Sequence, residues 1–203
     1  MIIQSIEQLK NKKNKITLDD DRCFCLYDSE LKKLGLCEQD EIDEALFNII
    51  FEEYLYARAK KKALAILNKT ICSKHQMKIK LRKYDFGEDV IEKVINFLME
   101  YNLLNDEEYA KTYISSYKNK KSIREIEFEL DKRGIDREIV KILIEDLEKL
   151  EIEIVNINKI VDKYRDEEGY IPLEKKQKIM SSLYRKGYNR HNIMKVMDNE
   201  DYR

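Results

Sequence analysis

Lysine and arginine side chains gathered in one acid-free stretch are the groups in this sequence best suited to a specific chemistry. Residues 57–84 contain ten of them and neither aspartate nor glutamate. Within this stretch Lys74, Lys78 and Arg82 recur every four residues, which places them on one face of a helix. Like charges at this spacing repel one another, so a fold gains nothing from the arrangement, whereas an anionic partner would. We therefore predict a basic stripe that binds such a partner.

A second basic region, in residues 175–190, repeats this feature. The candidate residues for binding a partner protein or DNA are therefore Arg58, Lys61, Lys62, Lys74, Lys78, Arg82, Lys83, Lys175, Lys178, Arg185, Lys186 and Arg190. The alternative is a solvated lysine-rich face, or one that pairs within the folded protein with residues 125–153, where eleven acidic residues outnumber five basic ones. Both interpretations stay open at this point.

Residue types and spacings that support catalysis are missing from the sequence. The two histidines, His75 and His191, have no plausible ligand neighbour, and the zinc-peptidase, Walker and dinucleotide-binding motifs are absent. The four cysteines lack the paired spacing of a metal site and are expected to be small buried thiols; they are Cys23, Cys25, Cys37 and Cys72. We therefore expect a protein that is not an enzyme and holds neither metal nor cofactor.

The composition predicts a mostly helical protein whose charge can attract a partner only where it is locally concentrated. Among 203 residues there are only five glycines and one proline, too few for the many tight turns of strand-rich folds. Lysine plus arginine (39) and aspartate plus glutamate (40) nearly cancel, so no overall field attracts nucleic acid or membrane. No signal peptide and no apolar stretch of membrane-spanning length is evident. We expect a cytoplasmic monomer without membrane contact.

The chain contains an internal repeat of about fifty residues, which is typical of repeat architectures. Residues 75–100 align with residues 124–149 at an offset of 49, and eight apolar positions match without a gap. A third copy lies 53 residues further on, where Asn192 and Glu200 replace apolar residues, as expected for the outer face of a terminal repeat. The equivalent turns contain Asp85, Gly134 and Gly187, where a helix end often needs a left-handed residue.

Helix start signals divide each copy into three helices. Ser73 with Gln76, and Ser122 with Glu125, have the spacing of a capping box at the start of the middle helix. Pro172 is expected at the first position of the corresponding helix in the third copy.

The tyrosines are expected to pack in the core. Tyr109, Tyr113 and Tyr117 share one helix face, which indicates packing first and base stacking only second. Tyr84 and Tyr188 flank the repeat turns and are expected to pack as well.

The first forty residues differ from the rest. Residues 16–18 and 23–27, separated by a polar turn, predict a small β-hairpin. Residues 31–36 predict one helical turn closed by Gly35, and the helical body is expected to begin near Gln39. The fold class is thus all-α: tandem three-helix repeats in an elongated curved array, with an N-terminal β-hairpin. The expected divisions are 1–38 for the lead and 39–104, 105–149 and 150–203 for the three repeats.

This order of elements, with particular strings, resembles the RecX family, the bacterial regulators of the recombinase RecA. Residues 99–110, Met-Glu-Tyr-Asn-Leu-Leu-Asn-Asp-Glu-Glu-Tyr-Ala, are similar to a family string, and residues 58–67 followed by Ser73 are similar to the family's opening helix and cap. Asp85 and Asn102 stand where the family pattern has glycine.

The resemblance implies a modulator of homologous recombination. Such a protein binds along the groove of the RecA–single-stranded DNA filament and hinders ATP hydrolysis, strand exchange and co-protease activity. Direct contact of the basic helices with single- or double-stranded DNA is compatible with this role. Two other interpretations remain: a regulator that inserts a helix-turn-helix unit into duplex DNA, and a helical adaptor without nucleic acid.

Overall fold

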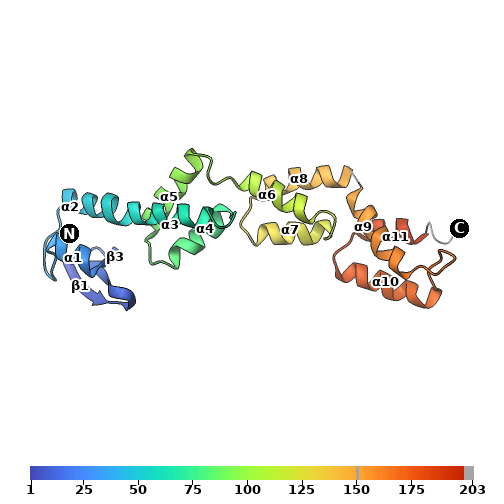
Figure 1. The fold of residues 1–203 in the computed structure, drawn as a ribbon, viewed down its shortest axis with the longest axis horizontal. Coiled ribbons are helices and arrows are strands. Elements are labelled where there is room, and N and C mark those ends of the chain that lie inside the picture. The colour runs from blue at the N-terminus through green and yellow to red at the C-terminus, as the bar shows by residue number, and fades with distance from the viewer. Residues whose placement is uncertain (150, 199–203) are drawn as a thin grey trace. The chain divides into compact units, whose positions relative to one another are not determined.

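The computed structural model describes residues 1–149 and 151–198. The chain divides into two compact units, Met1–Asn105 and Asp106–Arg203. Figure 1 shows the elements of both units. No helix in the described ranges is both long and apolar enough to cross a membrane.

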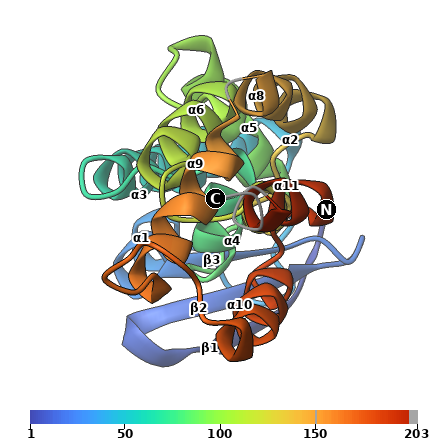
Figure 2. The same ribbon diagram turned by 90° about the vertical axis from the view of Figure 1, so that its right-hand side faces the viewer.

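The first unit begins with a three-stranded antiparallel sheet in the order β1-β2-β3, seen in Figure 2. Its strands are β1 (Ile3–Gln8), β2 (Lys13–Leu18) and β3 (Cys23–Tyr27). The predicted hairpin corresponds to β2 and β3. The prediction missed the third strand, β1, which pairs with β2 along its length. A register shift between Ile3 and Ser5 interrupts the alternation of β1. The sequence therefore lacks the two-residue period by which a half-buried strand is recognised.

The helices of the first unit follow the sheet. They are α1 (Asp28–Leu34), α2 (Glu44–Ile49), the π-helical segment η2 (Ile50–Tyr56), α3 (Ala57–Leu67), α4 (Lys74–Arg82) and α5 (Glu88–Glu100). Gly35 closes α1 in the left-handed conformation, as predicted. The helical body begins at α2, later than the predicted Gln39, because the Asp43 carboxylate caps the backbone N–H of Leu46 at 2.7 Å. Figure 1 shows α2, η2 and α3 as one continuous helix.

The sheet and the first three-helix repeat share one hydrophobic core. Ile16 and Leu26 of the sheet lie in the same buried cluster as Met77 of α4 and Leu98 of α5. All four side chains are fully buried. The sheet is therefore a structural part of the first repeat and not a detached lead.

The second unit contains two further repeats of three helices. One comprises α6 (Asp106–Tyr117), α7 (Ile123–Asp131) and α8 (Arg137–Lys149); the other comprises α9 (Ile152–Val161) with the short η3 (Asp162–Tyr164), α10 (Leu173–Arg185) and α11 (Arg190–Asp198). Each has its own buried cluster. Pro172 occupies the N-cap of α10, one position before the predicted one.

The predicted caps and turns are present. Ser73 and Gln76 form the reciprocal capping box of α4, with both hydrogen bonds at 3.2 Å. The Ser122 hydroxyl accepts from the backbone N–H of Glu125 at 3.2 Å, so the N-cap of α7 is confirmed. The reciprocal half of the predicted box is not formed, because the Glu125 carboxylate pairs with Lys121 at 2.8 Å. Asp85, Gly134 and Gly187 all adopt left-handed conformations, with φ of 64°, 68° and 81°. The repeat alignment is thereby confirmed at the turns, where it depends on backbone conformation rather than on apolar matching.

A polar junction joins the two repeats of the second unit. The Glu153 carboxylate, only 4% exposed, accepts hydrogen bonds from the backbone N–H groups of Ile123 (3.3 Å) and Asn189 (3.1 Å). It also accepts from the Asn192 side-chain amide at 2.8 Å. The interpretation of Asn192 as a solvent-facing residue of a terminal repeat was therefore wrong, since its amide is part of this junction. Glu200, interpreted in the same way, lies outside the described residues.

We expect the left-handed Asn102 (φ 51°) to make alanine costly at this position. Asn102→Ala lowers the free energy of unfolding by about 1 kcal/mol, because a Cβ without a local polar group is disfavoured there, while Asn102→Gly stays within about 0.5 kcal/mol of the parent. Asn68→Ala is the matched control, because Asn68 has a helical φ of −61°. Urea unfolding measures all three, and equal losses at both asparagines would contradict the assignment.

Removing the charge of Glu153 is expected to lower the hydrogen-exchange protection of the amides that it binds. Glu153→Gln keeps the shape but removes the charge that accepts three hydrogen bonds, so opening of the junction becomes easier by about 2 kcal/mol. Hydrogen exchange of the Ile123 and Asn189 amides measures this opening. Glu151→Gln, which weakens the exposed pair of Glu151 with Lys195, changes exchange by less than about 0.5 kcal/mol. Equal exchange in the two variants is the result that rejects the junction.

Candidate functional site

The basic stripe on α4 is partly neutralised by acids of the same repeat. Lys78 forms an ion pair with Glu92, and Arg82 forms a two-pronged pair with Glu88 at 2.6 and 2.8 Å. Both carboxylates belong to α5. Lys78 and Arg82 thus pair within the fold, which the spacing argument did not expect. Their partners lie on α5 of the same repeat and not in residues 125–153, where the alternative placed them.

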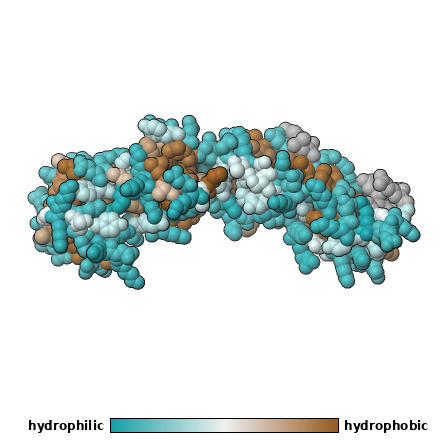
Figure 3. Space-filling model, viewed as in Figure 1, coloured by the Kyte–Doolittle hydropathy of each residue, from teal (hydrophilic) through white to brown (hydrophobic). Residues whose placement is uncertain are grey.

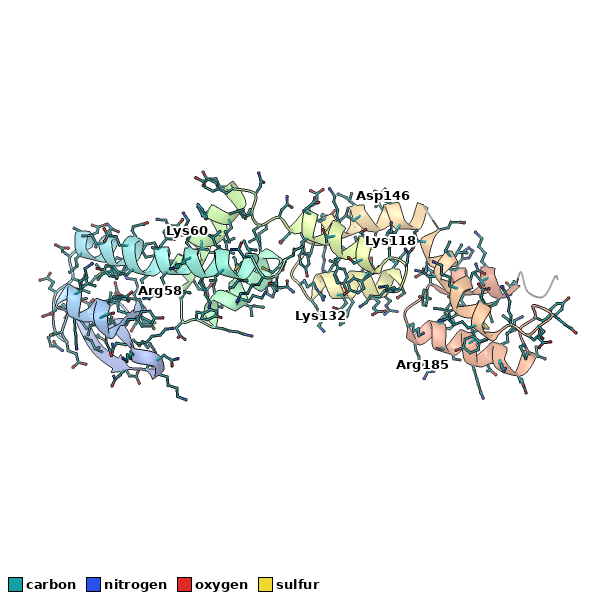
Figure 4. The ribbon with its side chains drawn as sticks, in the orientation of Figure 1. Arg58, Lys60, Lys118, Lys132, Asp146 and Arg185 are labelled. Atoms are coloured by element: carbon teal, nitrogen blue, oxygen red, sulfur yellow. The ribbon has the colours of Figure 1, made fainter. Side chains whose placement is uncertain are left out.

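The five predicted cations between residues 175 and 190, from α10 to the first residue of α11, have a different environment. Lys175, Lys178, Arg185, Lys186 and Arg190 are all exposed, and none forms an ion pair with a residue that the structure describes. Lys178 and Arg185 are seven residues apart and share one face of α10. Figure 4 labels Arg185 at the end of this helix, and the surface over α10 in Figure 3 is mostly hydrophilic. These side chains are available to an anionic partner.

Arg58 serves the fold of the first unit. Its guanidinium donates to the Glu30 carboxylate at 2.6 and 2.8 Å and to the backbone carbonyl of Cys25 at 2.6 Å. It also lies 4.8 Å from the ring centroid of Tyr27. In Figure 4 its label lies on the side of α3 that faces the sheet. Since these contacts use its donors, Arg58 positions neighbouring groups and is not itself offered to a partner.

Three distant segments meet at a basic, aromatic pocket of about 470 Å³ in the first unit. Asn11 comes from the short 3-10 turn η1 (Lys10–Lys12) and Lys13 from the start of β2. Lys61 and Lys62 come from α3, and Tyr84 comes from the turn between α4 and α5. Lys83, next to Tyr84 in that turn, is exposed. The structure thus brings three of the predicted site residues, Arg58, Lys61 and Lys62, to one cavity.

Tyr84 faces this pocket and is 41% exposed, so the prediction that it packs in the core was wrong. The Lys62 ammonium lies 3.8 Å from its ring centroid. Hydrogen bonding to Lys62 holds the pKa of Tyr84 below its ordinary value, with the positive charges of Lys62 and Lys69 acting in the same direction. Tyr188, predicted in the same way, is buried as expected.

The lysines around the start of β2 were overlooked in the sequence analysis. Residues 10–15 read Lys-Asn-Lys-Lys-Asn-Lys, four cations without an acid. The Nζ of Lys13 donates to the backbone carbonyl of Tyr84 and to the Asp85 carboxylate, each at 3.0 Å. The charge run itself was a usable signal, but its position beside α3 could not be read from the sequence.

Groups suited to metal or thiol chemistry are dispersed. In the part of the chain that the structure describes, no cluster of three or more His, Cys, Asp or Glu side chains could hold a metal ion. The prediction of buried thiols is confirmed for Cys25 and Cys72 but wrong for Cys23 and Cys37, which are exposed.

Comparison with known proteins decides the family. Models of the first and second three-helix domains of RecX match residues 59–98 and 105–142. The regulatory protein RecX of Clostridium perfringens strain SM101 is 31% identical over 98% of this chain and 98% of its own. The chain belongs to the RecX family.

Two further comparisons agree with this assignment. The regulatory protein RecX of Clostridium acetobutylicum is 30% identical over 96% of this chain and 94% of its own. The crystal structure of RecX from Lactobacillus salivarius is similar to 73% of this chain and 97% of its own, with a TM-score of 0.60 and 28% identity. Another crystal structure of a regulatory protein RecX covers 98% of this chain with a TM-score of 0.63 and 23% identity, which shows the shared fold.

The RecX-like sequence motifs of this chain lie at helices and turns. The two departures from the family pattern, Asp85 and Asn102, both occupy left-handed positions, so aspartate and asparagine adopt here the conformation for which glycine is the usual choice. Both residues thus keep the backbone conformation that these turns require.

Substitutions of Arg58 and Lys61 are expected to differ in their effect on the free energy of unfolding. Arg58→Gln leaves the half-buried Glu30 carboxylate without its cation and lowers the free energy of unfolding by about 2–3 kcal/mol. Lys61→Gln, three residues further along α3, changes it by less than about 0.5 kcal/mol because Lys61 is exposed. Urea unfolding of both variants measures the difference. Similar stabilities would mean that Arg58 is a surface residue.

Proposed function

We propose that this protein regulates the RecA recombinase by binding along the groove of the RecA–single-stranded DNA filament. Binding there hinders ATP hydrolysis, strand exchange and co-protease activity. Membership in a family whose members are named regulatory protein RecX supports this proposal. The protein acts by occupying a surface, as a cytoplasmic monomer that needs neither cofactor nor membrane.

The observation that carries the proposal is the set of five exposed cations on α10, in the turn after it and at the first residue of α11. Without ion pairs among the described residues, they can bind an anionic surface without first breaking internal contacts. A nucleoprotein filament offers such surfaces in its phosphates and acidic side chains. Lys78 and Arg82 must first leave Glu92 and Glu88, so we assign them a secondary part in docking.

The pairing of α4 also bears on the helix-turn-helix alternative. A reading helix must present its side chains to base edges in the major groove. Two cations of α4 instead contact α5, which disfavours α4 as that helix. Sequence-selective binding of duplex DNA is the outcome that would revive this alternative.

The test is the single-stranded-DNA-dependent ATPase of the cognate RecA, titrated with this protein and with the triple variant Lys175→Glu, Lys178→Glu, Arg185→Glu. We expect inhibition at well below one molecule per RecA subunit. Charge reversal turns attraction into repulsion, so the half-inhibitory concentration of the variant rises about tenfold or more.

The matched control reverses three exposed lysines of the preceding repeat: Lys120→Glu, Lys132→Glu and Lys141→Glu. It carries the same net charge change, and we expect its half-inhibitory concentration to stay within about threefold of the parent. Circular dichroism confirms that both variants fold. Absence of inhibition by excess folded parent protein, with filaments confirmed, rejects the proposed function. Equal weakening of both variants rejects the assignment to α10 and keeps only a dependence on overall charge.

A further inference from the structure

The pocket of the first unit combines uncompensated cations with an accessible aromatic ring. Lys13 and Arg58 are paired with Asp85 and Glu30 and hold the walls in place. Lys61 and Lys62, in contrast, have no carboxylate partner among the residues that the structure describes. The cavity therefore has a positive centre that an anionic ligand would neutralise.

The aromatic part of the pocket restricts the kind of anion. Tyr84 exposes 41% of its surface, and Lys62 lies over its ring. Tyr27 contributes a second ring to the lining. A flat ring beside two lysines suits a ligand with both a flat π-system and a phosphate, which is the chemistry of a nucleotide. An acidic peptide would satisfy the lysines but leave the ring without a stacking partner.

We propose that this pocket binds one nucleotide unit, with its phosphate at Lys61 and Lys62 and its base stacked on Tyr84. Lys62 can leave the tyrosine ring for the phosphate, because a charge-assisted hydrogen bond to phosphate is stronger than an exposed cation–π contact. The base then takes the place of the ammonium group on the ring.

A unit of single-stranded DNA fits the surroundings better than a free nucleotide. Exposed cations continue beyond the pocket, with Lys10 and Lys12 in the turn before β2, and Lys69 and Lys83 around Tyr84. A strand contacts several of these, whereas a free nucleotide uses the pocket alone. The inference rests on the proposed function, since the filament carries single-stranded DNA, and it adds a DNA contact in the first unit.

The experiment measures binding of a fluorescein-labelled oligo(dT) to the full-length protein without RecA, by anisotropy, at several salt concentrations. Lys61→Gln/Lys62→Gln is expected to weaken binding about tenfold and to reduce the slope of log K against log salt by about 1.4, roughly 0.7 per lost contact. The matched control is Lys32→Gln/Lys33→Gln, an adjacent lysine pair on α1 that does not line the pocket. Equal affinities and slopes in the two variants overturn the proposal.

Substitutions of Tyr84 test stacking separately from charge. Tyr84→Ala is expected to weaken oligo(dT) binding about tenfold, while Tyr84→Phe keeps the ring and most of the affinity. Tyr101→Ala, which removes an exposed tyrosine outside the pocket, is the control. A loss of affinity in Tyr84→Phe as large as in Tyr84→Ala overturns the stacking arrangement.

Competition with dTMP and ATP distinguishes the two sources of nucleotide. Displacement of oligo(dT) only at far higher concentrations of mononucleotide supports a strand site; equal affinities assign the pocket to a free nucleotide. The RecA ATPase assay on the same proteins separates the two hypotheses. If the parent protein inhibits RecA but does not bind oligo(dT), the nucleotide site is overturned and the proposed function stands. If it binds oligo(dT) but does not inhibit RecA, the proposed function is overturned and the nucleotide site stands.

Discussion

A left-handed residue between the second and third helix is the constraint on which each repeat depends. Because three-helix units are small, the third helix must reverse sharply to cover the second. In the third repeat the residue has to be glycine for two reasons, since its φ is 81° and a Cβ would lie 3.0 Å from the Ser122 hydroxyl. That hydroxyl donates to the Lys186 carbonyl at 2.7 Å, so the close approach also links the two repeats of the second unit.

In the first repeat the same constraint is met by Asp85, and the substitution adds a contact. A glycine would satisfy the backbone, but aspartate also places a carboxylate beside Lys13 and ties β2 to the α4–α5 turn. This contact brings the lysine-rich turn of the sheet to Tyr84 and α3. The basic, aromatic pocket therefore depends on Asp85, although glycine would adopt this left-handed backbone conformation more easily.

The sequence was sufficient for features that depend on local chemistry. The serine N-caps, the left-handed turns and the helices of the repeats could be predicted because each is decided within a few residues. The bulged strand β1, the inward role of Arg58 and the pocket could not, because they depend on contacts between distant segments. The stripe on α4 shows the limit most clearly. Its helical spacing was correct, but its charge is set by Glu88 and Glu92 on another helix, which no spacing rule reports.

The local disposition of charge is also what the proposed binding of a polyanion depends on, because the chain as a whole is nearly neutral. With a net charge of −1, the protein has no long-range attraction, so binding depends on contacts made within about one Debye length, roughly 8–10 Å in physiological salt. Cations are available in both units, at the pocket of the first and on α10 and α11 of the second. On a target with repeated binding sites, binding through one weak site of the chain raises the effective concentration of the other site near the target. Under the proposed function, a regulator built this way would stay dissociated from isolated anionic surfaces and would accumulate where many are arrayed along one filament.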